Sequence, residues 1–251
     1  MLTDEQLDRY ARHIILREVG GAGQARLLAA RVLIVGAGGL GAPAALYLAA
    51  AGVGTIGLVD DDTVSLSNLQ RQIIYAGADL GRPKVAAAAD TLARLDPGIR
   101  VVGHPLRLDD AAARDLVQGY DLILDGTDNF ATRHIVNRAC VAAGRVLVSG
   151  AVAQFEGQVA TFTGHLKGAA HPCYHCFVPE GTAAAAGCAA QGVLGAVTGV
   201  VGSLMAVEAL KELTGAGDSL AGRLVLYDAL STRFRTLRLA KDPACPVCSG
   251  G

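Results

Sequence analysis

The amino-acid sequence predicts an α/β protein whose doubly wound, mostly parallel sheet is extended near the C-terminus by antiparallel strands. Within residues 1–150, short apolar runs alternate with helical patterns, which is typical of βαβ units. After residue 150 the pattern changes, because residues 157–163 alternate in the manner of an antiparallel strand. A length of 251 residues is within the range of one large α/β domain.

The elements of the first half follow from local signals. We expect strands at residues 31–35, 55–60, 99–103, 121–125 and 146–149, and helices at residues 40–51, 84–95 and 130–143. Pro43 would lie in the first turn of the first of these helices, and Gly52 would end it. Asp96 and Pro97 would close the second helix. The ligand of such a sheet should bind beyond the carboxyl ends of its strands.

The second half contains further strand patterns at residues 223–228 and 233–239, preceded by one long helix that ends near Leu213. We interpret these elements as an extension of the same sheet. The prediction is therefore a single domain over residues 1–251, with one half at residues 1–150 and the other at residues 151–251.

Charge and composition exclude several classes of protein. A net charge of −1 argues against a general nucleic-acid binder, which needs a basic face. The N-terminal segment carries charges throughout and does not resemble a signal peptide, so we expect a cytoplasmic protein; Thr3 and Gln6 instead fit a capping box. Residues 181–207 are uncharged but rich in Ala and Gly, which predicts a flexible loop and a buried helix and no membrane span. Gly195 and Gly199 match GxxxG, a spacing that also serves close helix packing.

A glycine-rich loop predicts a nucleotide site. Residues 36–41 read GAGGLG, a GxGxxG motif between a predicted strand and a predicted helix. These glycines allow a tight turn and the close approach of a phosphate to the helix N-terminus. Asp60 follows at the end of the next strand, where an acid can bind ribose hydroxyls. Together these features predict an adenine-nucleotide site on a Rossmann-like sheet, and taken alone they would favour an NAD-dependent oxidoreductase.

Charged residues near this loop favour a triphosphate. Arg71 lies in the run SNLQRQ, Lys84 opens a predicted helix, and Asp128 follows a predicted strand. Two cations beside a phosphate loop can hold the oxygens of a triphosphate and neutralise charge as pyrophosphate leaves. Asp128 is placed to hold Mg²⁺, which takes carboxylate and phosphate oxygens. The alternatives are solvated helix-end cations for Arg71 and Lys84, and an N-cap for Asp128.

The segments RVLIVGAGGLG, LVDDDTVSLSNLQRQ, GRPK and DGTDN, with a PCYxC pair and a terminal CPVC, together resemble the MoeB/ThiF family. The resemblance covers nearly the whole chain. It implies an ATP-dependent adenylyltransferase that activates the C-terminal glycine of a ubiquitin-like sulfur-carrier protein of the MoaD or ThiS type, whose tail ends in Gly-Gly. Residues 1–150 would be the nucleotide-binding half, and residues 151–251 the carrier-binding and zinc half.

The resemblance also implies roles for single residues. Asp60 would bind the ribose, Arg71 and Lys84 would contact the ATP phosphates, and Asp128 would bind Mg²⁺ and be needed for catalysis. Arg12 matches an arginine that reaches the ATP site of the neighbouring subunit, which implies a homodimer; the alternative is a surface helix residue. The residues expected to bind the nucleotide are Gly36, Gly38, Gly39, Gly41, Asp60, Ser67, Asn68, Leu69, Gln70, Arg71, Lys84, Asp128 and Asn129.

Four of the six cysteines form two CxxC pairs, Cys173 with Cys176 and Cys245 with Cys248. A disulfide framework is not expected in a chain without an export signal. Two such pairs favour a closed and therefore structural Cys₄ zinc site. Isolated thiols or a redox pair are the alternatives.

Two histidines and a further cysteine lie near the first cysteine pair in the sequence. His171 and His175 adjoin the first pair, but with four thiolates available we do not expect them to be ligands. Cys188 matches the cysteine that some family members use for a thioester or persulfide link with the carrier; the alternative is a non-catalytic loop thiol. The loop at residues 165–190 would cover the entry of the carrier tail. Thr198 stands where the family usually has Pro.

Three other functions remain open at this point. They are an NAD-dependent oxidoreductase, ATP-dependent activation of a small-molecule or tRNA carboxylate, and a non-enzymatic zinc-stabilised scaffold. Arg71, Lys84 and Asp128 argue against the first and the third, and the near-neutral charge argues against tRNA. The sequence does not identify the carrier or its pathway, whether molybdopterin, thiamin or thio-tRNA. Because the chain ends soon after Cys248, we expect a separate sulfur donor protein.

Overall fold

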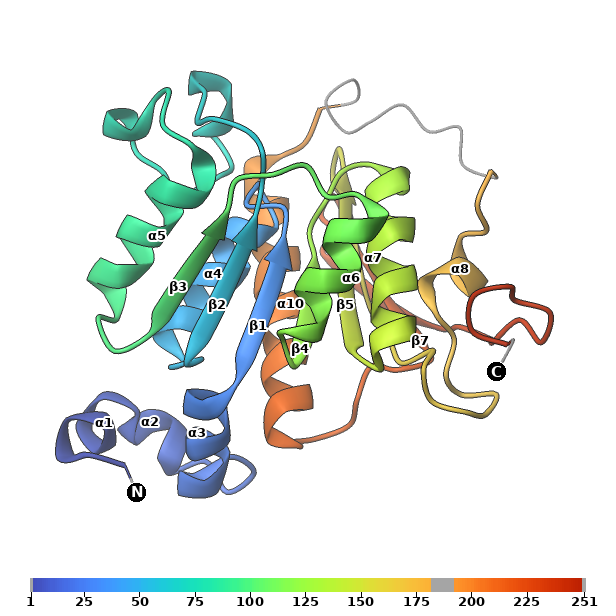
Figure 1. Cartoon of the computed structure of the whole chain (residues 1–251), viewed down its shortest axis with the longest axis horizontal. Helices are drawn as coiled ribbons and strands as arrows, with labels where there is room; N and C mark the ends of the chain where they lie inside the picture. The colour runs from blue at the N-terminus through green and yellow to red at the C-terminus, as the bar shows by residue number, and fades with distance from the viewer. Residues whose placement is uncertain (1, 182–191, 250–251) are drawn as a thin grey trace.

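The computed structural model describes residues 2–181 and 192–249, whose strands form one eight-stranded sheet in the order β3-β2-β1-β4-β5-β6-β7-β8 (Figure 1). The parallel strands are β1 (Arg31–Val35), β2 (Thr55–Val59), β3 (Arg100–His104), β4 (Leu122–Asp125) and β5 (Val146–Ala153). The antiparallel strands are β6 (Glu156–Phe162), β7 (Arg223–Asp228) and β8 (Arg233–Arg238). The predicted fold class is confirmed.

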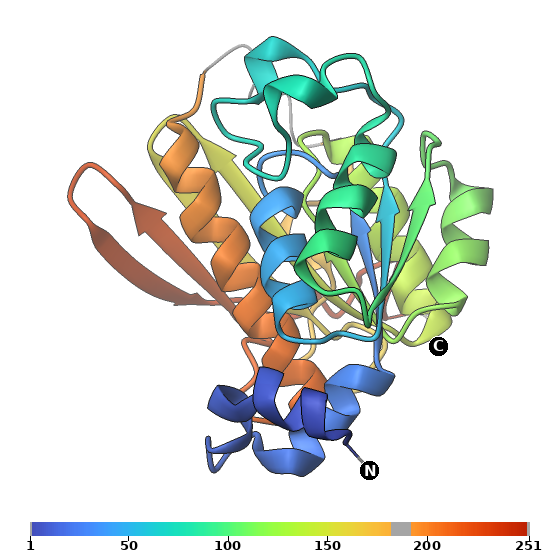
Figure 2. The ribbon, with the colours of Figure 1, turned by 90° about the vertical axis from the view of Figure 1, so that its left-hand side faces the viewer.

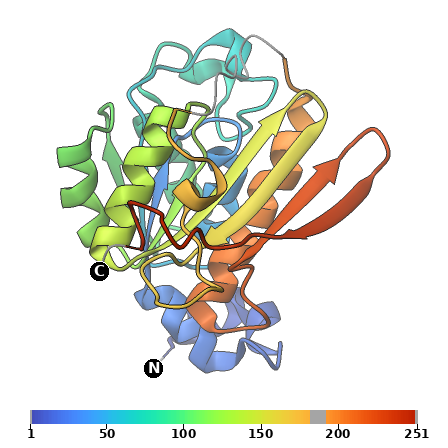
Figure 3. The same ribbon diagram turned by 90° about the vertical axis from the view of Figure 1, so that its right-hand side faces the viewer.

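Helices cover both faces of the sheet. On one face lie α4 (Gly41–Ala50), α5 (Lys84–Leu95) and α10 (Gly195–Thr214), as Figure 2 shows. On the other face lie α6 (Asp110–Gln118) and α7 (Phe130–Ala143), which face the viewer in Figure 3. Each layer has its own buried cluster, with Leu48 and Leu92 in the first and Val117 and Val136 in the second. Burial of apolar side chains on both faces explains why β1 and β4 are continuous apolar runs.

The strand order reverses at β1, and this fixes where a ligand can bind. β1 pairs in parallel with β2 on one side and with β4 on the other. Val35 and Asp125, the last residues of β1 and β4, are direct register partners. In doubly wound sheets the binding crevice opens at such a switch point, beyond the carboxyl ends of the strands.

Three short helices precede β1 and lie at the amino ends of the strands: α1 (Asp4–Arg9), α2 (Ala11–Ile14) and α3 (Gly20–Ala29) (Figure 1). The predicted capping box is confirmed, since the Thr3 amide donates to Gln6 Oε1 at 3.0 Å and the Gln6 amide to Thr3 Oγ1 at 3.2 Å. The hydroxyl of Tyr10 donates to the buried carboxylate of Asp96 at 2.6 Å, which ties this segment to the body of the protein.

The long helix α10 packs closely against α4, although not through the predicted glycine pair. A Cβ at Gly202 would lie 2.4 Å from Pro43 Cγ and 2.5 Å from the Leu40 carbonyl oxygen. A Cβ at Gly195 would lie 2.3 Å from the Gln70 carbonyl oxygen, whereas Gly199 faces open space. The close approach of α10 to α4 therefore uses Gly202, whereas Gly195, on the same face of α10, lies against the Gln70 carbonyl.

Several boundaries differ from the predicted ones. β5 continues past residue 150 to Ala153, because its second half pairs with β6 across a tight hairpin at Gln154 and Phe155. The helices α3 and α6 were not predicted. For α6 the signal was present, since the side chain of Asp109 caps the helix and Gly119 follows its end. Within residues 2–181 and 192–249, no helix has the length and apolar character needed to cross a bilayer.

Candidate functional site

A cleft of about 620 Å³ opens beyond the carboxyl ends of β1, β2 and β4. This volume falls in the range of small-molecule and cofactor sites. Its walls include most of the predicted nucleotide-binding residues: Gly36, Gly38, Gly39, Asp60, Ser67, Asn68, Gln70, Arg71, Lys84, Asp128 and Asn129. Residues far apart in the sequence, such as Gly36 and Asn129, thus meet in one site.

The glycine loop is shaped by two close backbone approaches. Gly36 has a φ of +90°, in the left-handed region that favours glycine. A Cβ at Gly41 would lie 1.9 Å from the Gly36 carbonyl oxygen, so only glycine lets α4 begin at this point. At Gly38, by contrast, the nearest atom to an added Cβ is Gln72 Nε2 at 3.7 Å. The loop therefore leaves room on its cleft side for a ligand to approach the N-terminus of α4.

We expect Gly41→Ala to disturb the phosphate loop. The added methyl group would collide with the Gly36 carbonyl and force the loop away from its position. The measurement is ATP affinity by calorimetry, with Gly199→Ala as the control, because that glycine is also helical but faces open space. Equal ATP affinity in both variants would contradict this account of the loop.

Asp60 connects the glycine loop to the segment after β2. Its Oδ2 accepts from the Ala37 amide at 2.9 Å, and its Oδ1 accepts from the Asp62 amide at 3.0 Å. Burial raises the pKa of the Asp60 carboxyl above its ordinary value, and the positive charge of Lys84 opposes this shift. Because a ribose hydroxyl donates best to an ionised carboxylate, nucleotide binding at this position favours the deprotonated acid.

This raised pKa predicts a pH dependence of nucleotide affinity. As the pH falls, Asp60 takes up a proton at a higher pH than an ordinary carboxyl does, and the neutral acid is a weaker acceptor. AMP affinity of the wild type should therefore weaken as the pH falls, and at a higher pH than an ordinary carboxyl would require. Asp60→Asn should bind AMP weakly at every pH and lack this titration. An identical pH profile for the two proteins would contradict the assignment.

The two predicted cations differ in their surroundings. Lys84 is 4% exposed, and its Nζ donates to Asp62 at 2.7 Å and lies 3.6 Å from Asp60 Oδ1. Arg71 is half-buried and donates to the Ser67 carbonyl at 3.0 Å. Both residues line the cleft. Because Lys84 is buried, it is not the fully solvated helix-end cation of the alternative interpretation. Asp62 was not predicted as a site residue, although it stands in the same acidic run as Asp60.

The loop after β4 carries Asp128. This side chain is exposed in the cleft wall. The N-cap of α7 is the next residue, Asn129, whose Oδ1 accepts from the Thr132 amide at 2.9 Å. The capping alternative for Asp128 is therefore excluded, and the amide of Asn129 is already used in the cap. Within residues 2–181 and 192–249 the Asp128 carboxylate has no hydrogen-bond or ion-pair partner, so it can bind a cation within the cleft.

Some predicted residues do not line this cleft. Gly41 lies behind the loop, and Leu69 is partly buried against the apolar cluster beside α4. Arg12 is exposed on α2, near the opposite ends of the strands (Figure 1). Cys188 lies outside the described residues, as does most of the loop after residue 181.

Other lining residues were not predicted at all. Among them are Gln72, Arg107, Thr127, Arg133 and Thr198. Gln72 is 4% exposed and is the last residue of the SNLQRQ run that contains Arg71. Its position beside Arg71 could have predicted that it lines the cleft. Thr198 reaches the cleft only because α10 packs beside the glycine loop. A Cβ added at Gly39 would lie 3.1 Å from Thr198 Cγ2. No local pattern indicated that contact.

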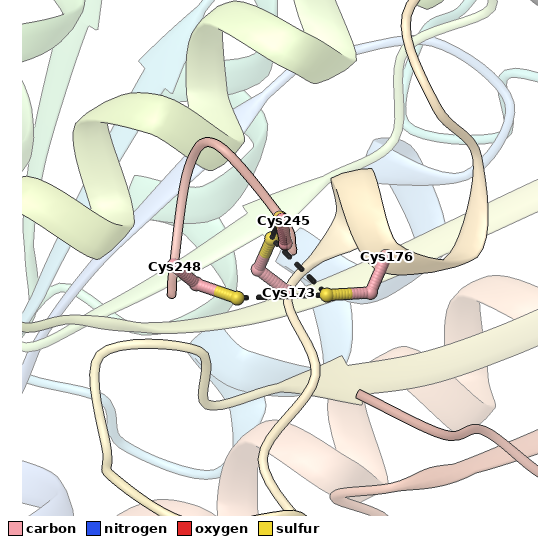
Figure 4. Close-up of side chains that lie close together, drawn as sticks. All are labelled: Cys173, Cys176, Cys245 and Cys248. Atoms are coloured by element: carbon pink, nitrogen blue, oxygen red, sulfur yellow. Dashed lines mark hydrogen bonds between the residues drawn. The ribbon is translucent and has the colours of Figure 1, made fainter. Parts of the chain in front are cut away.

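The four predicted cysteines meet at one point, as Figure 4 shows. The Sγ atoms of Cys173 and Cys176 lie 3.9 Å apart, those of Cys173 and Cys245 3.7 Å, and those of Cys176 and Cys248 3.5 Å. Tetrahedral zinc with Zn–S bonds of about 2.3 Å requires sulfur atoms about 3.8 Å apart. A disulfide would need about 2.05 Å. The residues therefore fit a Cys₄ zinc site.

The histidines beside these cysteines have other partners. His171 Nδ1 lies 2.9 Å from Thr163 Oγ1. The ring of His175 contacts that of His134 edge to face. Among the described residues, the cluster of possible metal ligands at this point contains only the four cysteines. The expectation that the histidines are not ligands agrees with this geometry.

Curated relatives match along nearly the whole chain. A sulfur carrier protein adenylyltransferase of Thermus thermophilus is 50% identical over 249 residues, covering 98% of this chain and 92% of the relative. The molybdopterin-synthase adenylyltransferase of Escherichia coli is 47% identical over 247 residues, with 98% of both chains covered. A probable adenylyltransferase/sulfurtransferase, MoeZ of Mycobacterium tuberculosis, is 50% identical over 247 residues, but this chain spans only 63% of it.

A solved structure and a family pattern also match this chain. The crystal structure of Escherichia coli MccB with AMPCPP and MccA superposes with a TM-score of 0.83 over 96% of this chain and 74% of that chain. At 22% identity this likeness concerns the fold alone. The ThiF family pattern matches residues 10–247. This match covers most of the chain, and the chain is therefore a member of the ThiF family.

Proposed function

We propose that this protein adenylates the C-terminal glycine of a ubiquitin-like sulfur-carrier protein, using ATP and releasing pyrophosphate. The observation that carries the proposal is the cleft itself, where the glycine loop, two cations and a free carboxylate converge beyond β1 and β4. A dehydrogenase needs only the first of these. The names of the relatives from Thermus thermophilus and Escherichia coli support the same reaction.

The proposed reaction needs positioning more than acid-base chemistry. The carrier carboxylate attacks the α-phosphorus of ATP, a new C–O–P linkage forms, and the bond from the α-phosphorus to the bridging oxygen of pyrophosphate breaks. Arg71 and Lys84 would neutralise the charge on the departing pyrophosphate. Asp128 would hold Mg²⁺, which would supply positive charge to offset that of the phosphate oxygens. Asp60 would hold the ribose.

The pairing of Lys84 with Asp62 is compatible with this role. The ammonium group of Lys84 is held at the cleft by the Asp62 carboxylate at 2.7 Å. The backbone amide of Lys84 also donates to the Asp62 carbonyl at 3.0 Å. The Lys84 side chain is therefore held in place before the triphosphate binds. Such preorganisation lowers the entropy that must be lost in the transition state.

Further partners are proposed on the same basis. A Gly-Gly tail suits a narrow entry to the α-phosphate, since glycine presents no side chain. Arg12 would reach the cleft of a second copy in a homodimer, because it is exposed and lies apart from its own cleft. The four cysteines would hold a structural zinc ion that joins the C-terminal segment to α8 (Tyr174–Phe177). Cys188 would be available for a covalent link to the carrier.

ATP–pyrophosphate exchange in the presence of Mg²⁺ tests the proposed function. Candidate carriers ending in Gly-Gly are compared with the same carriers lacking the terminal glycine. Exchange should depend on the full-length carrier, and the carrier that supports it identifies the substrate. Absence of exchange with every carrier, from folded and zinc-loaded protein, would contradict the proposal. Binding of NAD with micromolar affinity would then favour an oxidoreductase.

A further inference from the structure

The buried side chain of Arg133 has no role in the nucleotide binding proposed above. It lies on the first turns of α7 and is 6% exposed, yet it lines the cleft. A charged group is costly to bury unless it makes strong hydrogen bonds. The guanidinium donates to the carbonyl of Thr127 and, at 3.1 Å, to the carbonyl of Gly150.

These two acceptors belong to separate segments of the chain. Thr127 lies in the loop between β4 and Asp128, and Gly150 lies within β5. The same loop is held from its other side by Asp125, whose Oδ1 accepts from the Thr127 amide at 3.0 Å and from the Thr127 hydroxyl at 2.7 Å. Thr127, the residue just before Asp128, is therefore held by the buried carboxylate of Asp125 through its amide and hydroxyl, and by the buried guanidinium of Arg133 through its carbonyl.

The helix that carries Arg133 is itself anchored at the cysteine cluster. One turn further along α7, Asn137 Oδ1 accepts from the Tyr174 amide at 2.8 Å, and its Nδ2 donates to Cys173 Sγ at 3.5 Å. Positions 133 and 137 share one face of the helix.

We propose that Arg133 is a positioning residue, which fixes the loop of Asp128 for metal-dependent binding of the triphosphate. This inference rests on the proposed function, because it gives Asp128 the Mg²⁺ ion. The side chain of Asp128 is exposed and has no rigid partner among the described residues, so its orientation depends on the backbone before it. Removal of such a supporting interaction typically costs about 10- to 100-fold in metal affinity or activity.

The test uses Arg133→Met and Arg133→Lys in the full chain, with Arg138→Met as the control. Arg138 is one turn or more away on the same helix, and its ion pairs with Asp110 and Glu180 lie on the outer surface. The readout is affinity for a non-hydrolysable ATP analogue as a function of Mg²⁺, with AMP affinity measured in parallel. AMP affinity reports the glycine loop and Asp60, whose carboxylate accepts from the amides of Ala37 and Asp62, whereas the guanidinium of Arg133 donates to the carbonyls of Thr127 and Gly150.

We expect Arg133→Met to need about 10- to 100-fold more Mg²⁺ for half-maximal analogue affinity, with AMP affinity unchanged. Arg133→Lys should recover part of this loss, because an ammonium can still donate to one of the two carbonyls. Arg138→Met should match the wild type. If Arg133→Met does not fold, Arg133→Lys is judged by the same two affinities.

Two results would overturn the inference. One is a wild-type Mg²⁺ requirement in the folded Arg133 variants. The other is an equal loss of AMP and analogue affinity, which would mean that the residue only supports the fold. Neither result depends on a carrier. Failure of the wild type to exchange pyrophosphate would contradict the proposed function while leaving these binding measurements interpretable.

Discussion

Asp128→Ala should reduce ATP–pyrophosphate exchange by at least about 100-fold, because a metal ion bound to phosphate oxygens supplies several kcal/mol of charge stabilisation. The loss should fall mainly on the rate of exchange, since the glycine loop and Asp60 would still bind the rest of the nucleotide. Thermal stability should not change, because the Asp128 side chain is exposed and does not cap α7.

Two further variants make this prediction specific. Asp115→Ala removes an equally exposed carboxylate on α6, away from the cleft, and should leave exchange unchanged. Asn129→Ala removes the actual N-cap of α7 and should cost about 1 kcal/mol of stability, with a smaller effect on exchange. If Asn129→Ala abolished exchange and Asp128→Ala did not, the proposed magnesium ligand would be the wrong residue.

Cys176→Ser should remove bound zinc and produce the largest fall in stability among these variants. A ligand present at about 1,000 times its dissociation constant stabilises the folded state by about 4 kcal/mol. For a chain of this size, that corresponds to a fall of roughly 8 to 16 °C in Tm. Zinc content by atomic absorption and Tm by calorimetry check the prediction, and a chelator should act on the wild type in the same direction.

The matched control is Cys140→Ala. Cys140 is buried on α7, apart from the cysteine cluster. This variant should retain one zinc ion per chain and show only the modest cost of a small cavity. A zinc content that survives in Cys176→Ser, or a Tm that does not respond to metal removal, would contradict a structural zinc site.

The order of elements was largely predictable from the sequence, because hydrophobic periodicity and turn residues are local signals. The segment RVLIV followed by GAGGLG specifies a buried strand, a tight turn and a helix within one short stretch, and the structure has this arrangement as β1 and α4. The antiparallel extension after residue 150 followed from its alternation. Ends of elements were less certain, as β5 shows, because its last residues are stabilised by pairing with β6.

The side chains of the cleft were predictable where a motif carried them and unpredictable where only packing did. Asp60, Arg71, Lys84 and Asp128 stand in recognisable runs, and all line the cleft. Arg133 stands in an ordinary helical pattern, and only the fold shows that its guanidinium reaches Thr127 and Gly150.

The sequence by itself determined the fold class, the glycine loop and the two cysteine pairs, because each of these is encoded by residues close together in the chain. Only the tertiary structure decided that Cys176 and Cys248 approach to 3.5 Å, that Asn129 and not Asp128 caps α7, and that Gly202 is the close contact of α10. The physical reason is that such contacts depend on how complete elements pack. A spacing in the sequence fixes the face of a helix or strand, but it does not fix the neighbour that this face meets.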